Sequence, residues 1–323
     1  MINTLVGEHF LIEQELGRDQ FGIVYIGRDT RWRREVKQVA IRILDKRLCM
    51  LPGFAERLAE IAPKLASWDQ LYINRVIAQG VMRDVQSGAN LHYLVNEPPG
   101  TETLYAYVQR VRSQLSPDLV AVLIEQIAAA LEYANRQNII HGNLNLWNIT
   151  MRERNGAASV EVTDFGLVQL LTPFSQKEHE QMIGWKVPAG IPEFIAPERF
   201  RGEPPSKSND VYDFGVILYF ILSGRYPFTG TYDQLILAHS YQNPPSLGPL
   251  VAHGPEIHTM MIRLLSKAPL DRMSVQDVCI RYRQINNLPR TMLPVFDSHP
   301  PLLTPPPGDT GDLKKKGGWF GRS

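Results

Sequence analysis

The sequence is short of cysteine, of net charge and of long apolar runs, and each shortage argues against a class of protein. Its 323 residues include two cysteines, Cys49 and Cys279, too few for a disulfide scaffold. Lysine and arginine number 34 against 33 acidic residues, and the net charge of +1 favours no nucleic-acid partner. The longest apolar run, residues 215–222, is too short for a transmembrane segment.

The N-terminal sequence MINTLVGEHF lacks the charged start and apolar core of a signal peptide. With so few cysteines, this predicts a soluble protein located in the cytoplasm. Hydrophobic residues make up 44% of the chain, which is enough for one large domain or for two lobes with cores of their own.

The pattern of apolar residues divides the chain into an N-terminal part rich in strands and a helical part. Residues 1–98 contain short alternating runs typical of strands and one helical segment near residues 53–62, which Pro63 is expected to end or kink. Residues 99–288 are mainly helical. Ser116 and Pro117 form a helix start, and Gly224 is expected to end another helix.

The last segment, residues 289–323, differs in composition. Seven prolines lie between positions 289 and 307, so the segment is predicted to be a disordered tail. Lys314–Lys316, Trp319 and Phe320 near its end allow a weak contact with an anionic membrane surface.

Two short motifs near the N-terminus indicate a phosphate-binding loop. In ELGRDQFGIVY, Gly17 and Gly22 frame a turn whose backbone N–H groups can approach phosphates, although a plain hairpin turn is the alternative. Asp19, at the middle position, would repel a phosphate. About 20 residues further on, VAIRIL contains Arg42.

Three more motifs follow in the second half of the chain. HGNLNLWN places His141, Leu144 and Asn148 at the spacing of a phosphoryl-transfer loop. Sixteen residues after Asn148, VTDFGLV contains the metal-binding type of sequence Asp164-Phe165-Gly166. AGIPEFIAPERF then contains Ala196-Pro197-Glu198.

In this order the motifs resemble those of the protein kinase family, and the pattern is most similar to bacterial serine/threonine kinases. The resemblance covers residues 9–286 and implies an α+β, bilobal fold with a small β-rich N-lobe and a larger helical C-lobe. It implies ATP and Mg²⁺ as cofactors, with Asn148 and Asp164 as metal ligands. The residues that it places against the nucleotide are Gly17, Gly22, Val24, Ala40, Arg42, Val95 and Asn96.

The resemblance also implies structural roles for residues outside the cleft. Asp210 is expected to hold the backbone of the catalytic loop, and Arg272 is expected to pair with Glu198.

The sequence departs from the family pattern where the chemistry is carried. Arg42 replaces a lysine, and Asn143 replaces the catalytic aspartate, although an amide oxygen is a very poor base. Asn145 replaces a lysine that touches the transferred phosphate. The positions changed together are Asp19, Arg42, Gly142, Asn143, Asn145 and Ile191.

Two assignments remain open between neighbouring residues. The glutamate expected to pair with the residue at position 42 is either Glu56 or Glu60. Val95 is assigned to the gatekeeper at the back of the adenine pocket, which puts Pro98 where a backbone N–H would bind adenine. A shift of one residue would put Pro99 there, and neither proline has that N–H.

These departures favour a pseudokinase that binds nucleotide weakly or not at all and acts as a signalling scaffold or allosteric partner of another protein. One alternative is a slow ATP- and Mg²⁺-dependent serine/threonine kinase, since positioning and electrostatics supply most of the catalysis in this family. Another is a passive kinase-like body whose tail, residues 289–323, binds the partner.

Overall fold

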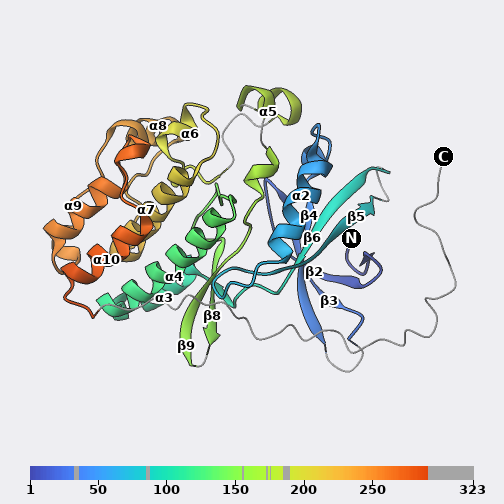
Figure 1. Cartoon of the computed structure of the whole chain (residues 1–323), viewed down its shortest axis with the longest axis horizontal. Coiled ribbons are helices and arrows are strands. Elements are labelled where there is room, and N and C mark those ends of the chain that lie inside the picture. Colours follow the sequence, from blue (N-terminus) through green and yellow to red (C-terminus); the bar gives the residue numbers. More distant parts are fainter. Residues whose placement is uncertain are drawn as a thin grey trace.

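The structure is a computed structural model that describes residues 1–32, 36–84, 88–154, 156–171, 174, 176–184 and 190–289. Figure 1 shows two lobes, one built around a sheet and the other mainly of helices. The predicted α+β fold with a β-rich N-lobe and a helical C-lobe is therefore confirmed. Residues 290–323, predicted to be a disordered tail, lie outside the described residues.

The N-lobe is a six-stranded antiparallel sheet in the order β1-β2-β3-β4-β6-β5. Its strands are β1 (Leu5–Val6), β2 (Phe10–Asp19), β3 (Gly22–Asp29), β4 (Lys37–Leu44), β5 (Val76–Arg83) and β6 (Asn90–Asn96). Two helices lie between β4 and β5 in the chain: α1 (Lys46–Cys49) and α2 (Phe54–Ala66). The second of them packs against β5.

Helix α2 continues past Pro63, so of the two expected effects of this proline, an end or a kink, the end is wrong. Proline removes one hydrogen bond of the last turns. Ala62 and Leu65, on either side of it in sequence, are both buried in the core, and their burial stabilises the extra turn.

The C-lobe consists of helices and a small three-stranded sheet in the order β7-β8-β9. Its strands are β7 (Glu102–Thr103), β8 (Ile149–Arg154) and β9 (Ala157–Val162). Its α-helices are α3 (Leu104–Val111), α4 (Pro117–Arg136), α5 (Gln176–Ile183), α6 (Pro197–Phe200), α7 (Lys207–Ser223), α8 (Tyr232–Tyr241), α9 (Gly254–Leu264) and α10 (Val275–Ile285). The described residues of the lobe also form short 3-10 helices: η1 (Arg112–Gln114), η2 (Val168–Leu171), η3 (Gly248–Leu250) and η4 (Pro269–Asp271).

Local signals fix the ends of the two central helices of this lobe. The Ser116 hydroxyl accepts a hydrogen bond from the Leu119 N–H and caps α4, as predicted. Helix α7 is buried along nearly its whole length and ends at Gly224, whose φ of 69° is the left-handed conformation that glycine adopts easily. Both predicted helix ends are confirmed.

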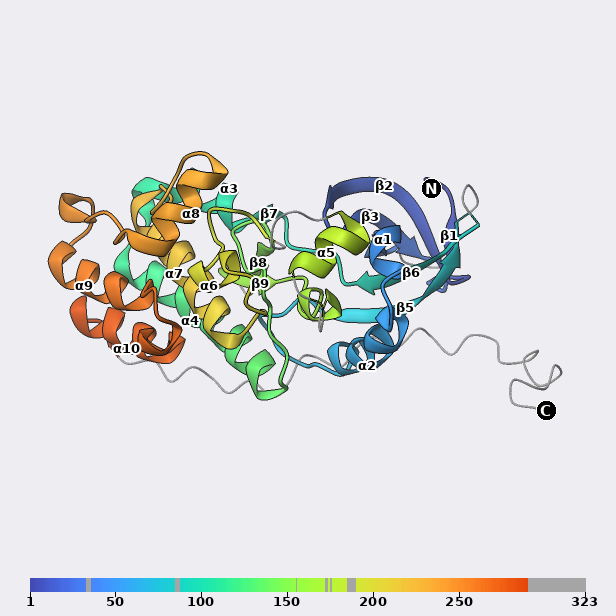
Figure 2. The same ribbon diagram turned by 90° about the horizontal axis from the view of Figure 1, so that it is seen from above.

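Seen from above in Figure 2, α5 lies close to the N-lobe, although it belongs to the segment after the Asp-Phe-Gly motif. It packs against α1. Within the ranges that the structure describes, no helix is both long and apolar enough to cross a membrane.

Candidate functional site

A cleft of about 730 Å³ lies between the lobes. Of the residues that the resemblance assigns to the nucleotide, Gly17, Val24, Ala40, Arg42 and Asn96 line this cleft. The residues assigned to catalysis and to the metal line it as well: Asn143, Asn145, Asn148 and Asp164. The sequence motifs therefore meet in one cavity.

Gly22 has a structural role in the sheet of the N-lobe. It has a φ of 141°, and a Cβ added to it would lie 2.0 Å from the Ile43 carbonyl oxygen on β4. Glycine is needed here because two strands approach closely.

A buried carboxylate, that of Asp210, binds the backbone of the catalytic loop, residues 141–148. The backbone N–H groups of His141 and Gly142 donate to the two oxygens of Asp210, at 2.9 and 2.7 Å. Burial raises the pKa of Asp210 to about 6, against the opposing effect of these two donors. The predicted role of Asp210 is confirmed.

His141 is a structural residue in this loop. It is fully buried, its Nε2 lies 2.9 Å from the Thr163 carbonyl oxygen, and burial lowers its pKa to about 4. It therefore stays neutral near pH 7 and connects the catalytic loop to the strand end before Asp164.

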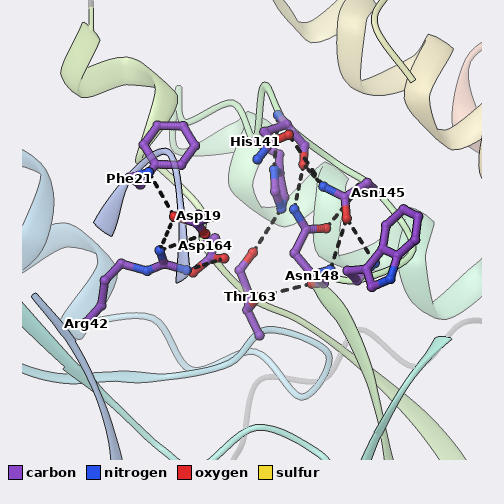
Figure 3. A network of polar contacts seen from close by, with 10 residues as sticks. Asp19, Phe21, Arg42, His141, Asn145, Asn148, Thr163 and Asp164 are labelled. Carbon is purple, nitrogen blue, oxygen red and sulfur yellow. Dashed lines mark hydrogen bonds and ion pairs between the residues drawn. The ribbon is translucent and has the colours of Figure 1, made fainter. Parts of the chain in front are cut away.

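Three asparagines of the loop bind one another (Figure 3). The side-chain amides of Asn145 and Asn148 both donate to the backbone carbonyl of Asn143. The Asn145 N–H donates to the Asn148 Oδ1 at 2.9 Å. Asn145 is only 3% exposed and turns into the loop, where its own Oδ1 accepts from the N–H groups of Trp147 and Asn148. These amides stabilise the loop, and none of them is a general base.

Arg42 is the centre of the charged part of the cleft, as Figure 3 shows. Its guanidinium donates to both oxygens of Asp19, at 2.9 and 2.8 Å, and to Asp164 Oδ2 at 2.8 Å. Burial alone would lower the pKa of Arg42, but the carboxylates of Asp164 and Asp19 raise it overall. One cation thus joins the glycine-containing turn to the Asp-Phe-Gly motif.

The pairing gives Asp19 a role that its position alone did not reveal. Besides Arg42, its carboxylate accepts the Phe21 N–H at 2.8 Å, which fixes the turn. The two carboxylates and one guanidinium leave a net charge of −1 where the resemblance places phosphates, and that charge opposes a polyanion.

Neither glutamate of α2 pairs with Arg42. Glu56 and Glu60 are both exposed, and Glu60 binds Lys64 at 2.8 Å on the helix surface. The buried face of α2 carries Ile61 and Leu65 instead. Both open assignments for this partner are therefore wrong, because the carboxylates reach Arg42 from the turn and from the Asp-Phe-Gly motif.

The pairing of β4 with β6 corrects the gatekeeper assignment. Ala40 lies opposite Asn96, and Arg42 lies opposite Leu94. Side chains alternate along a strand, so Asn96 faces the cleft with Ala40 and Arg42. Val95 is fully buried in a separate cluster on the other face of the sheet and does not line the cleft.

The shift by one residue makes Pro99 the residue three positions beyond the gatekeeper. Adenine offers an amino donor beside a ring-nitrogen acceptor, so a backbone edge that binds it must supply a C=O and an N–H. Pro99 has no N–H. The Glu97 carbonyl already accepts the Asn74 side-chain amide at 3.2 Å. Asn74 also lines the cleft, and no motif in the sequence singled it out.

Gly142 stands where the family pattern has an arginine, and a side chain at this position would be both strained and crowded. Its φ is 70°, and an added Cβ would lie 3.0 Å from the Cβ of Val168. Ile191, in place of a threonine, is part of the cleft wall and packs on the core. The last motif keeps its structural role, since Arg272 binds the buried Glu198 at 2.6 and 2.7 Å, as predicted.

The contacts described above engage several of the atoms that a Mg²⁺–ATP complex requires, Asp164 Oδ2 among them. Asp164 is paired with Arg42, Asn148 Oδ1 accepts a backbone N–H, and the backbone edge lacks a free donor and acceptor for adenine. The residues present therefore do not fit this complex in the described arrangement. Among the described residues, no group of three or more His, Cys, Asp or Glu side chains offers another metal site.

Comparisons with known proteins agree with the fold and its motifs. The family model described as protein tyrosine and serine/threonine kinase matches residues 10–281. The chain is 30% identical over 271 residues to serine/threonine-protein kinase Pkn1 of Myxococcus xanthus, covering 81% of this chain and 36% of that protein. It is 28% identical over 282 residues to PkaA of Streptomyces coelicolor, covering 84% of this chain and 49% of the relative.

The chain thus spans less than half of the length of these two curated relatives. The crystal structure of the PknI kinase domain of Mycobacterium tuberculosis matches with a TM-score of 0.65 at 17% identity, over 88% of this chain and 99% of that domain. The matched family model, the relatives and the fold together show that the chain belongs to the protein kinase family and is related to bacterial serine/threonine kinases.

Proposed function

We propose that this member of the kinase family is a pseudokinase that acts as a signalling scaffold or allosteric partner. The observation that carries the proposal is the position of Arg42, which is nearly buried and bound to Asp19 and Asp164 at once. The positive charge at this position, which binds phosphates in a kinase, here forms ion pairs with two carboxylates of the protein itself.

The chemistry of the catalytic loop supports the same proposal. Asn143 has no carboxylate to accept a proton from a substrate hydroxyl, and its backbone carbonyl binds two neighbouring amides. Asn145 is nearly buried, and its side-chain amide binds backbone groups of the loop. The groups that would supply the base, the phosphate contact and the adenine-binding backbone in a kinase therefore make contacts within the protein.

A scaffold acts through its surfaces, so we propose a protein partner in a signalling pathway and a cytoplasmic location. A weak contact of the tail with a membrane surface, through Lys314–Lys316, belongs to the same proposal.

Thermal unfolding of the full chain tests the proposal. It is measured alone, with ATP, with Mg²⁺ and with both. A ligand present at 100 times its Kd stabilises the folded state by about 2.7 kcal/mol, which is easily seen in the melting temperature. We expect no rise with millimolar Mg²⁺–ATP. The variant Glu60→Ala, which removes an exposed ion pair outside the cleft, is the matched control for nonspecific effects.

The slow kinase is the rival that the same experiment separates. It keeps Asp164 and Asn148 as possible metal ligands. A rise in melting temperature that requires Mg²⁺, together with phosphoryl transfer that Asp164→Ala abolishes, would overturn the pseudokinase proposal. Absence of both results leaves only the surfaces and the tail as sites of action.

A further inference from the structure

A second cavity, of about 580 Å³, lies in the C-lobe between α3, η1, the start of α4, the end of α7 and the segments η3, α9 and α10. Its volume falls within the range that bound ligands and peptide side chains fill. Most of its wall is apolar, formed by residues that include Leu115, Val120, Ile221, Leu250, Val251 and Ile257.

The wall on the α3–η1 side is polar and positively charged. Arg110 and Arg112 both line it. Arg110 is paired with Glu102. Arg112 donates to the Ser223 carbonyl oxygen at the end of α7, which fixes its position at the cavity. Within the described ranges, no carboxylate forms an ion pair with Arg112, so an occupant with apolar side chains and one acidic group would complement the cavity.

The C-terminal end of α10 lies at this cavity. Tyr282 and Asn286, at the end of α10, line the cavity. Asn287 has a φ of 54°, and the Leu288 N–H donates to the Arg283 carbonyl at 2.9 Å. This arrangement is the hydrogen bonding of a Schellman-type helix end.

The last described residue is anchored close to the cavity. Arg283 donates to the Pro289 carbonyl oxygen at 2.9 Å and also binds Glu125 on α4. Glu125 and Val120 are five residues apart, which is about 7.5 Å along that helix. The chain therefore leaves the described part of the C-lobe near the apolar wall.

The residues that follow Pro289 have side chains that complement the wall of the cavity. Residues 291–297 read TMLPVFD, in which four large apolar side chains precede Asp297. If extended, seven residues span about 23 Å. Leu293 and Phe296 suit the apolar wall, and Asp297 suits Arg112.

We propose that residues 291–297 of the same chain occupy this cavity. The C-lobe then extends past α10, and residues 298–323 are the part left for contact with a partner. This inference does not depend on whether the cleft binds nucleotide.

Photo-crosslinking in the full chain tests the proposal. Phe296 is replaced by p-benzoylphenylalanine, and Leu303 is replaced in a matched control further along the tail. Equal amounts of isotopically light and heavy chain are mixed and irradiated, and the adducts are mapped by mass spectrometry. We expect adducts within single chains, on peptides containing Val120, Leu250 or Ile257, with a yield about tenfold above that of the control.

Variants and outcomes keep the test decisive. Asp297→Lys should lower the adduct yield, whereas Asp309→Lys should not. Unchanged melting curves show that each substituted chain is folded. Adducts between light and heavy chains would assign the cavity to a second copy, and equal yields from both positions or adducts on the N-lobe would exclude the cavity as the site. Each of these results overturns the proposal.

Discussion

Removal of the Arg42 guanidinium should destabilise the protein in proportion to how well each partner carboxylate is shielded from water. The Arg42 side chain is 8% exposed, that of Asp164 is 23% exposed and that of Asp19 is 42% exposed. Breaking a buried pair costs about 3–5 kcal/mol, whereas exposed pairs are worth about 0.2–1 kcal/mol. We therefore expect a coupling of about 1–2 kcal/mol between Arg42 and Asp164, and about 0.5–1 kcal/mol between Arg42 and Asp19.

Two double-mutant cycles measure these couplings. They use Arg42→Met with Asp164→Asn and with Asp19→Asn, which keep the shapes of the side chains. Calorimetric melting is the assay, because each kcal/mol shifts the melting temperature of a protein of this size by roughly 1.5 °C. The control cycle is the exposed pair Arg18–Glu15 on β2, which should show no measurable coupling because solvent screens both charges.

The order of the couplings decides the outcome. If the Asp19 coupling equals or exceeds that of Asp164, burial does not govern these pairs. If both match the control, Arg42 is not held in the way described, and the main support for the pseudokinase proposal is lost.

Three more predictions concern other parts of the molecule. The double variant Asn74→Val, Pro99→Ala frees the Glu97 carbonyl and gives position 99 an N–H. Two hydrogen bonds of about 1 kcal/mol each should then raise the affinity for adenosine roughly thirtyfold, measured by calorimetric titration. Gly142→Ala should cost about 1–3 kcal/mol more than Gly156→Ala in denaturant unfolding, since both have a positive φ but only the first meets neighbouring atoms. Burial lowers the pKa of His239 to about 3, so the unfolded chain binds more protons between pH 3 and about 6.5 and stability falls as the pH drops through that window. Between pH 7.5 and pH 5 the native chain should lose about 2 kcal/mol more than His239→Gln, measured by urea unfolding at each pH.

Local signals predicted much of the fold. Ser116 and Gly224 mark helix ends through their own hydrogen bonding and conformation, so one sequence suffices to find them. Pro63 misled because its effect on α2 depends on what neighbouring side chains bury, which only the packed structure reveals. The order of the six strands in the N-lobe sheet could not be predicted from the sequence, because strand pairing is decided by contacts between distant segments.

The site was predictable where motif spacing fixes position and unpredictable where two changes act together. The catalytic-loop asparagines and Asp164 meet in the cleft as the motifs require. Asp19 and Arg42 each departed from the family pattern when considered alone. Only the packing of β2, β3 and β4 into one sheet brings their side chains into contact.

The gatekeeper error has a different origin. Strand β6 carries apolar residues on both faces, so its pattern does not tell which side faces the cleft. The pairing with β4 decides the matter in favour of Asn96.

The ion pair between Asp19 and Arg42 also restricts the order in which mutations can restore a kinase-like cleft. Replacing Asp19 by glycine first leaves Arg42 with a single carboxylate. Replacing Arg42 by lysine first loses the arrangement in which Nη1 binds Asp19 and Nη2 binds Asp164. Each single step lowers stability before any phosphate contact can compensate. The effects of the two replacements are therefore expected to depend on each other, although Asp19 on β2 and Arg42 on β4 are separated in the sheet by β3.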